Sequence, residues 1–309
     1  MFGAPPIIET TVFTRLPDSL RIKHENAWTR ARGSGPLHSF LEGPSFDRAG
    51  NLYCVDVCHG RIFRITPEGH WNVFAEYDGH PNGLKIHRDG RIFVADQKFG
   101  LLCFDPQTGH RTQLSDGAEH GGFRGLNDLV FADNGDLYFT DPGESALENP
   151  DGRVFRLRST GELDLLMSGL AYPNGLVLNA KQDILYVAVT RTLQVLRLPL
   201  RSHPSDPDIR RVFKAGVFLQ LSGGLAGPDG MAIDQSGGLI VAHSGLAAVW
   251  VFTPLGEPLA RIRSCAGIRT TNVAFGGHDL KSLFITESEQ GVILRAELPV
   301  AGCAMYAHF

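Results

Sequence analysis

The chain has 309 residues, of which 43% are hydrophobic and 20% are charged, and its formal net charge is −4. This composition is that of a globular protein, and the length allows one large domain or two. The weak negative charge, without any run of Lys or Arg, argues against a nucleic-acid or membrane-surface partner.

The segment "IIETTVFTRL" (7–16) predicts a strand near the N-terminus, and residues 21–35 precede the first repeat with Trp28 as a candidate rim residue. The first residues show no basic leader, and no segment reaches the ~20 apolar residues that span a bilayer. Five cysteines, an odd and sparse set, suit a reducing compartment. We therefore expect a cytoplasmic protein, and its oligomeric state stays open.

Six segments further along the chain share one plan, which is a short apolar strand, a polar turn usually with glycine, and a second apolar strand. They begin at Gly43, Gly83, Leu126, Gly175, Asp229 and Asn272. A third strand such as "GRIFRITPEG" (60–69) and a weaker fourth strand such as "HWNVFAEY" follow. Four antiparallel strands per unit are typical of a propeller blade.

The spacing of the repeats supports the same architecture. The residues that open the first strands are Glu42, Asn82, Asn127, Asn174, Asp229 and Asn272, which gives intervals of 40, 45, 47, 55 and 43 residues. These intervals match propeller blades. We predict an all-β, six-bladed β-propeller as a single domain over residues 1–309, with a closing strand and rim segment in 1–41, six blades in 42–297 and a tail in 298–309.

The ring of blades must be closed, because open first and last blades would expose unpaired strand edges. Residues 7–16 are the favoured strand to complete the last blade, and "CAMYAHF" (303–309) is the alternative. The loop 215–228 accounts for the longest interval between repeats, and we expect it and the loop 116–125 to lie over the channel mouth, with 215–228 as a lid.

First strands line the central channel of a propeller, so their six opening side chains should converge on the axis. Asn and Asp beside Gly are also common turn formers, but turn chemistry alone does not require an acid or amide in every blade. Carboxylate and amide oxygens crowded in a channel favour a hard cation. We expect Ca²⁺, with Mg²⁺, Mn²⁺ and Zn²⁺ left open.

Four motifs resemble the gluconolactonase, regucalcin and senescence-marker-protein family. They are "LEGPSF" (41–46), "GLNDLVF" followed by "LYFTDP" (125–142), "YPNGLVL" (172–178) and "GPDGMAID" (227–234). The resemblance covers nearly the whole chain after residue 40. It implies a six-bladed propeller with one divalent cation on its axis and an activity that hydrolyses lactones.

The resemblance also implies roles for single residues. Glu42 and Asn174 match metal ligands, and Asp229 matches a metal ligand that also acts in the chemistry. Asn127 matches a position that contacts substrate or completes the metal shell. Asp128 is expected to be a supporting residue, because neighbours on a strand face opposite ways.

One departure from the family affects the choice of substrate. Members that hydrolyse sugar lactones carry an arginine two residues before the equivalent of Asn127, where this sequence has Gly125 and places Arg124 one position earlier. A preference for sugars therefore does not follow. Asn82, Arg124 and His243 are further candidates for substrate binding, although loop or structural roles are the alternatives for the last two.

The predicted function is a metal-dependent, gluconolactonase-like hydrolase that opens a sugar lactone or another small lactone, with a carbonyl polarised by the metal and Asp229 as the base that activates water. Direct attack of Asp229 on the acyl carbon is the variant that the sequence cannot separate from this. The alternatives are an organophosphate or aryl-ester hydrolase at the same site, and a calcium-binding propeller without catalysis.

Overall fold

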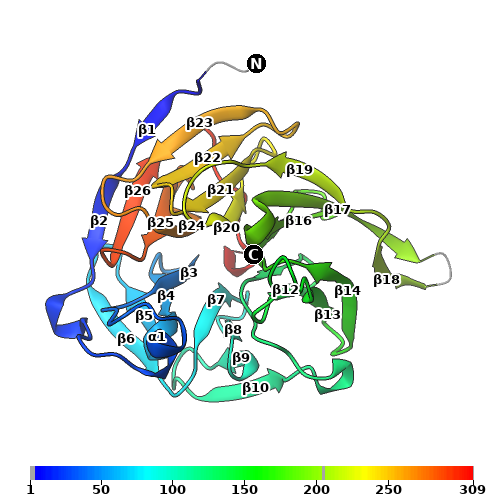
Figure 1. Cartoon of the computed structure of the whole chain (residues 1–309), viewed down its shortest axis with the longest axis horizontal. Coiled ribbons are helices and arrows are strands. Elements are labelled where there is room, and N and C mark those ends of the chain that lie inside the picture. Colours follow the sequence, from blue (N-terminus) through cyan, green and yellow to red (C-terminus); the bar gives the residue numbers. More distant parts are fainter. Residues whose placement is uncertain (1–3, 204–205, 309) are drawn as a thin grey trace.

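The repeats form six antiparallel blades arranged in a ring around a central axis (Figure 1), which confirms the predicted six-bladed β-propeller. The computed structural model describes residues 4–203 and 206–308. The other residues of the predicted domain, 1–3, 204–205 and 309, lie outside the described residues. No helix within the described ranges is long and apolar enough to cross a membrane.

Blades one to three each contain four strands in chain order. Blade one contains β3 (Leu41–Phe46), β4 (Leu52–Asp56), β5 (Arg61–Ile65) and β6 (Trp71–Glu76). Blade two contains β7 (Pro81–Ile86), β8 (Ile92–Asp96), β9 (Gly100–Phe104) and β10 (Arg111–Ser115). Blade three contains β11 (Leu129–Phe131), β12 (Leu137–Asp141), β13 (Gly152–Leu157) and β14 (Leu163–Leu170).

Blades four to six depart from this simple order. Blade four contains β15 (Pro173–Leu178), β16 (Ile184–Val189), β17 (Gln194–His203), β18 (Asp206–Val212) and β19 (Gly216–Gln220). Blade five contains β20 (Gly227–Ile233), β21 (Leu239–Ser244), β22 (Ala248–Phe252) and β23 (Pro258–Arg263), and blade six contains β24 (Thr270–Gly276), β25 (Ser282–Glu287) and β26 (Val292–Glu297). The N-terminus supplies β1 (Ile7–Glu9) and β2 (Thr11–Arg15).

The N-terminal segment closes the ring. β2 pairs antiparallel with β26 and is the fourth strand of blade six, as predicted for residues 7–16. β1, however, pairs in parallel with β23 and adds a fifth strand to blade five. The two strands thus join neighbouring blades, and the backbone N–H and side-chain hydroxyl of Thr10 between them donate to the carbonyl of Arg263.

Half of the segment 215–228 is part of the sheet, in β19 and the first two residues of β20, so the prediction of a lid there is wrong for β19. β19 pairs antiparallel with residues 194–197 of β17 and forms the outer edge of blade four. The outer half of β17 pairs instead with β18 in a hairpin that projects from the ring (Figure 1). This hairpin, and not a long mouth loop, accounts for most of the length by which the 55-residue interval exceeds the other intervals of 40 to 47 residues.

Side chains alternate along the strands, so each blade buries an apolar face against both neighbours. In β4, for example, Tyr53 and Val55 pack toward blade two, whereas Leu52 and Cys54 pack toward blade six. Six apolar clusters result, one between each pair of neighbouring blades. The ring is held together by these clusters.

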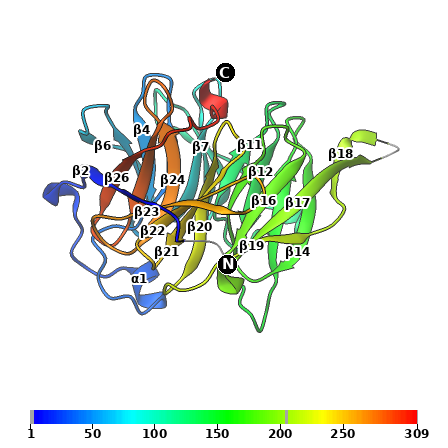
Figure 2. The same cartoon turned by 90° about the horizontal axis from the view of Figure 1, so that it is seen from above.

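Two short segments lie on opposite faces of the ring (Figure 2). The helix α1 (Ala27–Ala31) is capped by Asn26, whose side chain accepts from the backbone of Thr29. On the other face, the 3₁₀ turn Tyr306–His308 lies over the axis, and the Tyr306 ring stacks on Phe131 at 4.9 Å. Further 3₁₀ turns are Asp18–Leu20, Val57–His59, Ala118–His120 and Thr190–Thr192.

Candidate metal centre

The side chains that open the first strands are buried in the channel. Glu42, Asn82, Asn127, Asn174, Asp229 and Asn272 are all between 2% and 8% exposed. Pairing with the second strand shifts register beside Glu42, Asn82, Asn174, Asp229 and Asn272. A β-bulge changes the direction in which a side chain points. Each of these polar side chains therefore departs from the regular alternation of its strand.

Glycines after the opening residues let neighbouring first strands approach closely. A β-carbon at Gly43 would lie 2.7 Å from the backbone nitrogen of Leu84, and one at Gly175 would lie 2.2 Å from the carbonyl oxygen of Asp229. Neither position leaves space for a side chain. The glycines of the EGP and PNG motifs therefore serve the close packing of blades at the axis.

Asn272 connects two carboxylates from different blades. Its Nδ2 donates to Glu42 Oε2 at 3.0 Å and to Asp128 Oδ2 at 3.3 Å, while its Oδ1 accepts from the backbone of Val273. The backbone N–H of Gly43 also donates to Glu42 Oε2. Asn272 thus holds Glu42 and Asp128 in place, and its amide oxygen faces its own strand.

Three carboxylates of this cluster repel one another. Burial, and then the charge of Asp128, raises the pKa of Glu42 to about 8 from an ordinary value of 4.5. Burial, followed by the charges of Glu42 and Asp128, raises the pKa of Asp229 well above 3.8, and a hydrogen bond from Asn174 opposes this rise. The channel therefore disfavours three bare negative charges.

Asp128 belongs to the cluster, which corrects the prediction that it faces away from the axis. It is 2% exposed, and its carboxylate accepts from Asn272 beside Glu42. The prediction assumed regular strand alternation, but β11 begins only at Leu129. The two residues before that strand are not bound by its alternation, so both Asn127 and Asp128 are buried near the axis.

The amides of the ring differ in their hydrogen bonds. Asn174 donates to Thr190 Oγ1 at 3.1 Å, which fixes its side chain between blades four and five. Asn82 Oδ1 is buried and has no hydrogen-bond partner among the described residues. A buried amide oxygen without a partner is costly, and it is also a ready ligand.

A cavity of about 680 Å³ lies on the α1 face, over blades one to four. Its lining comes from connections that join second to third strands or lead into the next blade, including Cys58, His80, Arg124, Glu144 and Tyr172. α1 forms part of the wall. Trp28 donates to Gln97 at 3.1 Å and is covered by the Arg32 guanidinium at 4.1 Å.

The two residues proposed from sequence for substrate contact outside the ring have different surroundings. Arg124 lines this cavity and pairs with Asp151 at 2.7 Å. His243 is fully buried, its Nε2 donates to the carbonyl of Gly223 and its Nδ1 accepts from Trp250. In this arrangement His243 anchors the short loop before β20 and has no free ring nitrogen.

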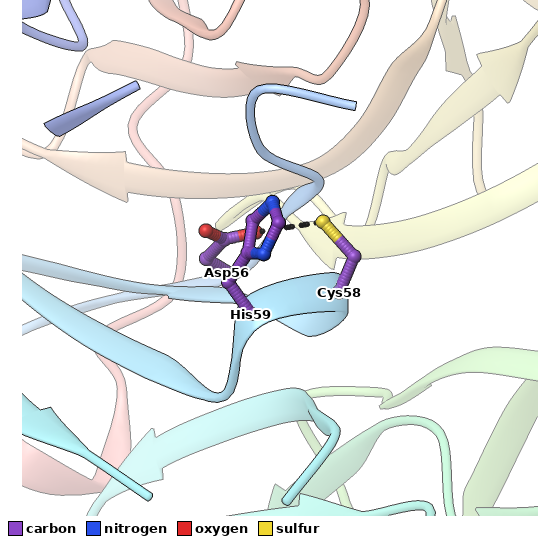
Figure 3. Close-up of side chains that lie close together, drawn as sticks. All are labelled: Asp56, Cys58 and His59. Carbon is purple, nitrogen blue, oxygen red and sulfur yellow. Dashed lines mark hydrogen bonds between the residues drawn. The ribbon is translucent and has the colours of Figure 1, made fainter. Parts of the chain in front are cut away.

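A second group with metal-ligand side chains, Asp56, Cys58 and His59, lies at the end of β4 (Figure 3). Asp56 accepts from the backbone of Phe40, from Cys58 and from Arg61. His59 donates from Nε2 to the carbonyl of Leu37 and accepts at Nδ1 from an amide. Burial raises the pKa of the Cys58 thiol. The carboxylate, thiol and imidazole of this group therefore make hydrogen bonds that connect neighbouring loops.

Comparison with known proteins identifies relatives along most of the chain. The family model described as "SMP-30/Gluconolactonase/LRE-like region" matches residues 40–289. A gluconolactonase of Zymomonas mobilis is 33% identical over 284 residues, covering 83% of this chain and 78% of the relative. The lactonase drp35 of Staphylococcus aureus strain USA300 is 30% identical over 276 residues, covering 86% of this chain and 81% of the relative.

Solved structures share the fold. A calcium-binding regucalcin from Agrobacterium tumefaciens superposes with a TM-score of 0.76 at 20% identity, covering 97% of this chain and 98% of the other. A gluconolactonase from Xanthomonas campestris gives a TM-score of 0.73 at 21% identity, covering 96% of this chain and 97% of the other. The match to the family model over most of the chain decides membership. The chain belongs to the SMP-30/gluconolactonase/LRE-like family.

Proposed function

We propose that this protein is a divalent-metal-dependent hydrolase that opens the ring of a small lactone. Relatives named gluconolactonase and lactonase support lactone hydrolysis as the reaction. The observation that carries the metal site is the set of three buried carboxylates, Glu42, Asp128 and Asp229, of which the first two share hydrogen bonds from Asn272 and whose repulsion raises the pKa of Glu42 and of Asp229. The buried oxygen of Asn82, which has no partner among the described residues, is a further candidate ligand. A cation bound among the carboxylates would relieve their repulsion, and with Asn82 as a ligand it would also satisfy that oxygen.

The donor set fits a hard cation. Glu42, Asn174 and Asp229 would hold the ion with oxygen atoms, and Asn127, Asn82 or Asp128 would complete the shell. Oxygen ligands of mixed charge suit Ca²⁺, which tolerates irregular cages. The calcium-binding regucalcin of the same fold is in keeping with this choice, and Mg²⁺, Mn²⁺ and Zn²⁺ remain candidates for the test below.

A bound divalent ion would polarise the lactone carbonyl and offset charge on the tetrahedral oxyanion. Asp229 would then take the proton of the attacking water on a carboxylate oxygen, with Asn174 fixing its orientation by the hydrogen bond between them. Glu42 and Asp128, both held by Asn272, would keep the cluster in position. Asp229 as a nucleophile on the acyl carbon is the alternative mechanism.

The test is a rate comparison on metal-stripped protein reconstituted with Ca²⁺, Mg²⁺, Mn²⁺ or Zn²⁺. Substrates are glucono-1,5-lactone, an alkyl-substituted lactone, an aryl ester and an aryl phosphotriester. We expect hydrolysis of at least one lactone that depends on the added ion and is lost in Asp229→Asn with the fold retained. Asp133→Asn, an exposed residue in the turn after β11, is the matched control with unchanged rate.

Other outcomes separate the alternatives. Turnover of only the aryl ester or the phosphotriester would favour the aryl-ester or organophosphate hydrolase. Tight ion binding without turnover of any substrate would favour a calcium-binding propeller without catalysis. Full activity in Asp229→Asn would remove Asp229 from the role of base.

A further inference from the structure

One layer of the channel, next to the ring of acids and amides, contains a single charged residue. The layer is defined by the first-strand residues that pair with Tyr53, Phe93, Tyr138, Tyr186, Ile240 and Phe284 of the second strands. Its members are Ser45, Lys85, Val130, Val177, Ala232 and Ala274, and all six line a cavity of about 320 Å³. Five of them are small or apolar, and the sixth is a lysine.

Lys85 directs its charge at the carboxylate cluster. Its Nζ lies 4.0 Å from Asp128 Oδ1, and the two side chains are only 17% and 3% exposed. The same ammonium acts on Glu42, where it opposes the rise in pKa. An ammonium group facing an apolar cavity is costly unless it is paired, so the carboxylates explain why a lysine is tolerated at this position of β7.

The charges in the channel balance when a divalent ion is included. Glu42, Asp128 and Asp229 contribute three negative charges once all are ionised, a divalent ion contributes two positive charges, and Lys85 contributes one. Without the lysine, the same three carboxylates would match a trivalent ion.

We propose that Lys85 is a fixed counter-charge that sets the preference of the axial site for a divalent over a trivalent cation. This inference rests on the metal site proposed above. The lysine need not touch the ion, because its effect is carried by charge over a short distance through a poorly hydrated channel.

Coulomb's law gives the inference a quantitative form. The repulsion between Lys85 and the bound ion is proportional to the charge of the ion, so removal of the lysine strengthens binding of a trivalent ion more than that of a divalent ion. For two hard ions of similar size, such as Ca²⁺ and Tb³⁺, the logarithms of the two gains should stand in the ratio of about 3 to 2. A gain of about tenfold for Ca²⁺ then corresponds to about thirtyfold for Tb³⁺.

The experiment measures ion binding directly, without substrate. Dissociation constants for Ca²⁺ and Tb³⁺ are determined by calorimetry and terbium luminescence on metal-stripped wild type, Lys85→Met and Lys85→Gln, at one pH and ionic strength. Lys85→Arg keeps the charge, and Lys281→Met removes an exposed lysine from the turn after β24. We expect both neutral variants at position 85 to bind both ions more tightly, Tb³⁺ by the larger factor, and both controls to bind like wild type.

Three results would overturn the inference in distinguishable ways. Equal factors for the two ions in the neutral variants would mean that Lys85 acts through packing and not through charge. Weaker binding of both ions would mean that Lys85 serves to keep the carboxylates ionised and does not select the charge of the ion. Failure of the wild type to bind either ion would refute the metal site itself, and the role of Lys85 with it.

Discussion

Gly230 offers a test of the ring that leaves every proposed ligand unchanged. It follows Asp229 in β20, and the absence of a side chain makes room for Asn272 of the next blade. A β-carbon at position 230 would lie 2.0 Å from both Cγ and Oδ1 of Asn272, where ordinary contact requires 3.4–4 Å. The substitution Gly230→Ala must therefore push Asn272 out of its place.

The effect of Gly230→Ala on the free energy of unfolding follows from the hydrogen bonds that Asn272 makes. Its Nδ2 donates to Glu42 at 3.0 Å and to Asp128 at 3.3 Å. A hydrogen bond contributes about 1.5–3 kcal/mol when one group is charged and about 0.5–1.5 kcal/mol when both are neutral. Because Glu42 is mainly neutral at pH 7 in metal-free protein, the loss of both bonds should lower the free energy of unfolding by about 2 kcal/mol or more. Metal affinity should fall as well, because two carboxylates lose the group that positions them.

A double-mutant cycle in urea checks this explanation. In an Asn272→Ala background the three atoms nearest the new β-carbon are absent, so Gly230→Ala should cost less than about 1 kcal/mol there. Gly216→Ala is the control, because a β-carbon at Gly216 meets no heavy atom within 4 Å, and its effect should stay within about 0.5 kcal/mol. Equal costs of Gly230→Ala in the two backgrounds would refute the reasoning.

Two further predictions concern buried carboxylates. In metal-free protein the raised pKa of Glu42 means that its neutral form is favoured by folding, so its contribution to stability is full below pH 4.5 and is lost as the pH rises to about 8; urea titrations across this range should show a smaller loss in Glu42→Gln than in wild type, because the buried Asp229 still contributes its own loss in the variant. Asp141 is fully buried, accepts from the backbone of residues 124–125 and pairs with Arg153. Asp141→Ala should therefore lower the free energy of unfolding by about 3–5 kcal/mol, whereas Asp78→Ala, at an exposed ion pair, should cause no measurable change in the same assay.

The sequence was sufficient to predict the architecture because the repeat is carried by local signals. An apolar strand, a glycine turn and a second apolar strand recur at nearly constant spacing, and the structure places each pair as the first two strands of a blade. The closing strand in 7–16 was also predictable, since an open blade would expose an edge. That β1 would join blade five depended on long-range pairing with β23, for which the sequence carries no local signal.

Regular strand geometry and the spacing of the repeats do not predict every feature of the structure. Asp128 was expected to face away from the axis because strand neighbours alternate, but β11 begins after it. The loop 215–228 was expected to be a lid because of the long interval before it, yet a hairpin of β17 and β18 takes up that length. No sequence pattern indicates a role for Lys85, because a lysine in a strand usually lies on a solvent-exposed face.

The fold can hold a cluster of carboxylates because other parts of the ring stabilise it. Stability comes from six apolar clusters between blades and from the strand β2 that closes the ring. At the axis, the burial of Glu42, Asp128 and Asp229 and the repulsion among them work against folding. A ligand that binds only the folded ring recovers this free energy on binding. The crowding of carboxylates at the axis, which opposes folding without a ligand, therefore supports the cation site proposed above.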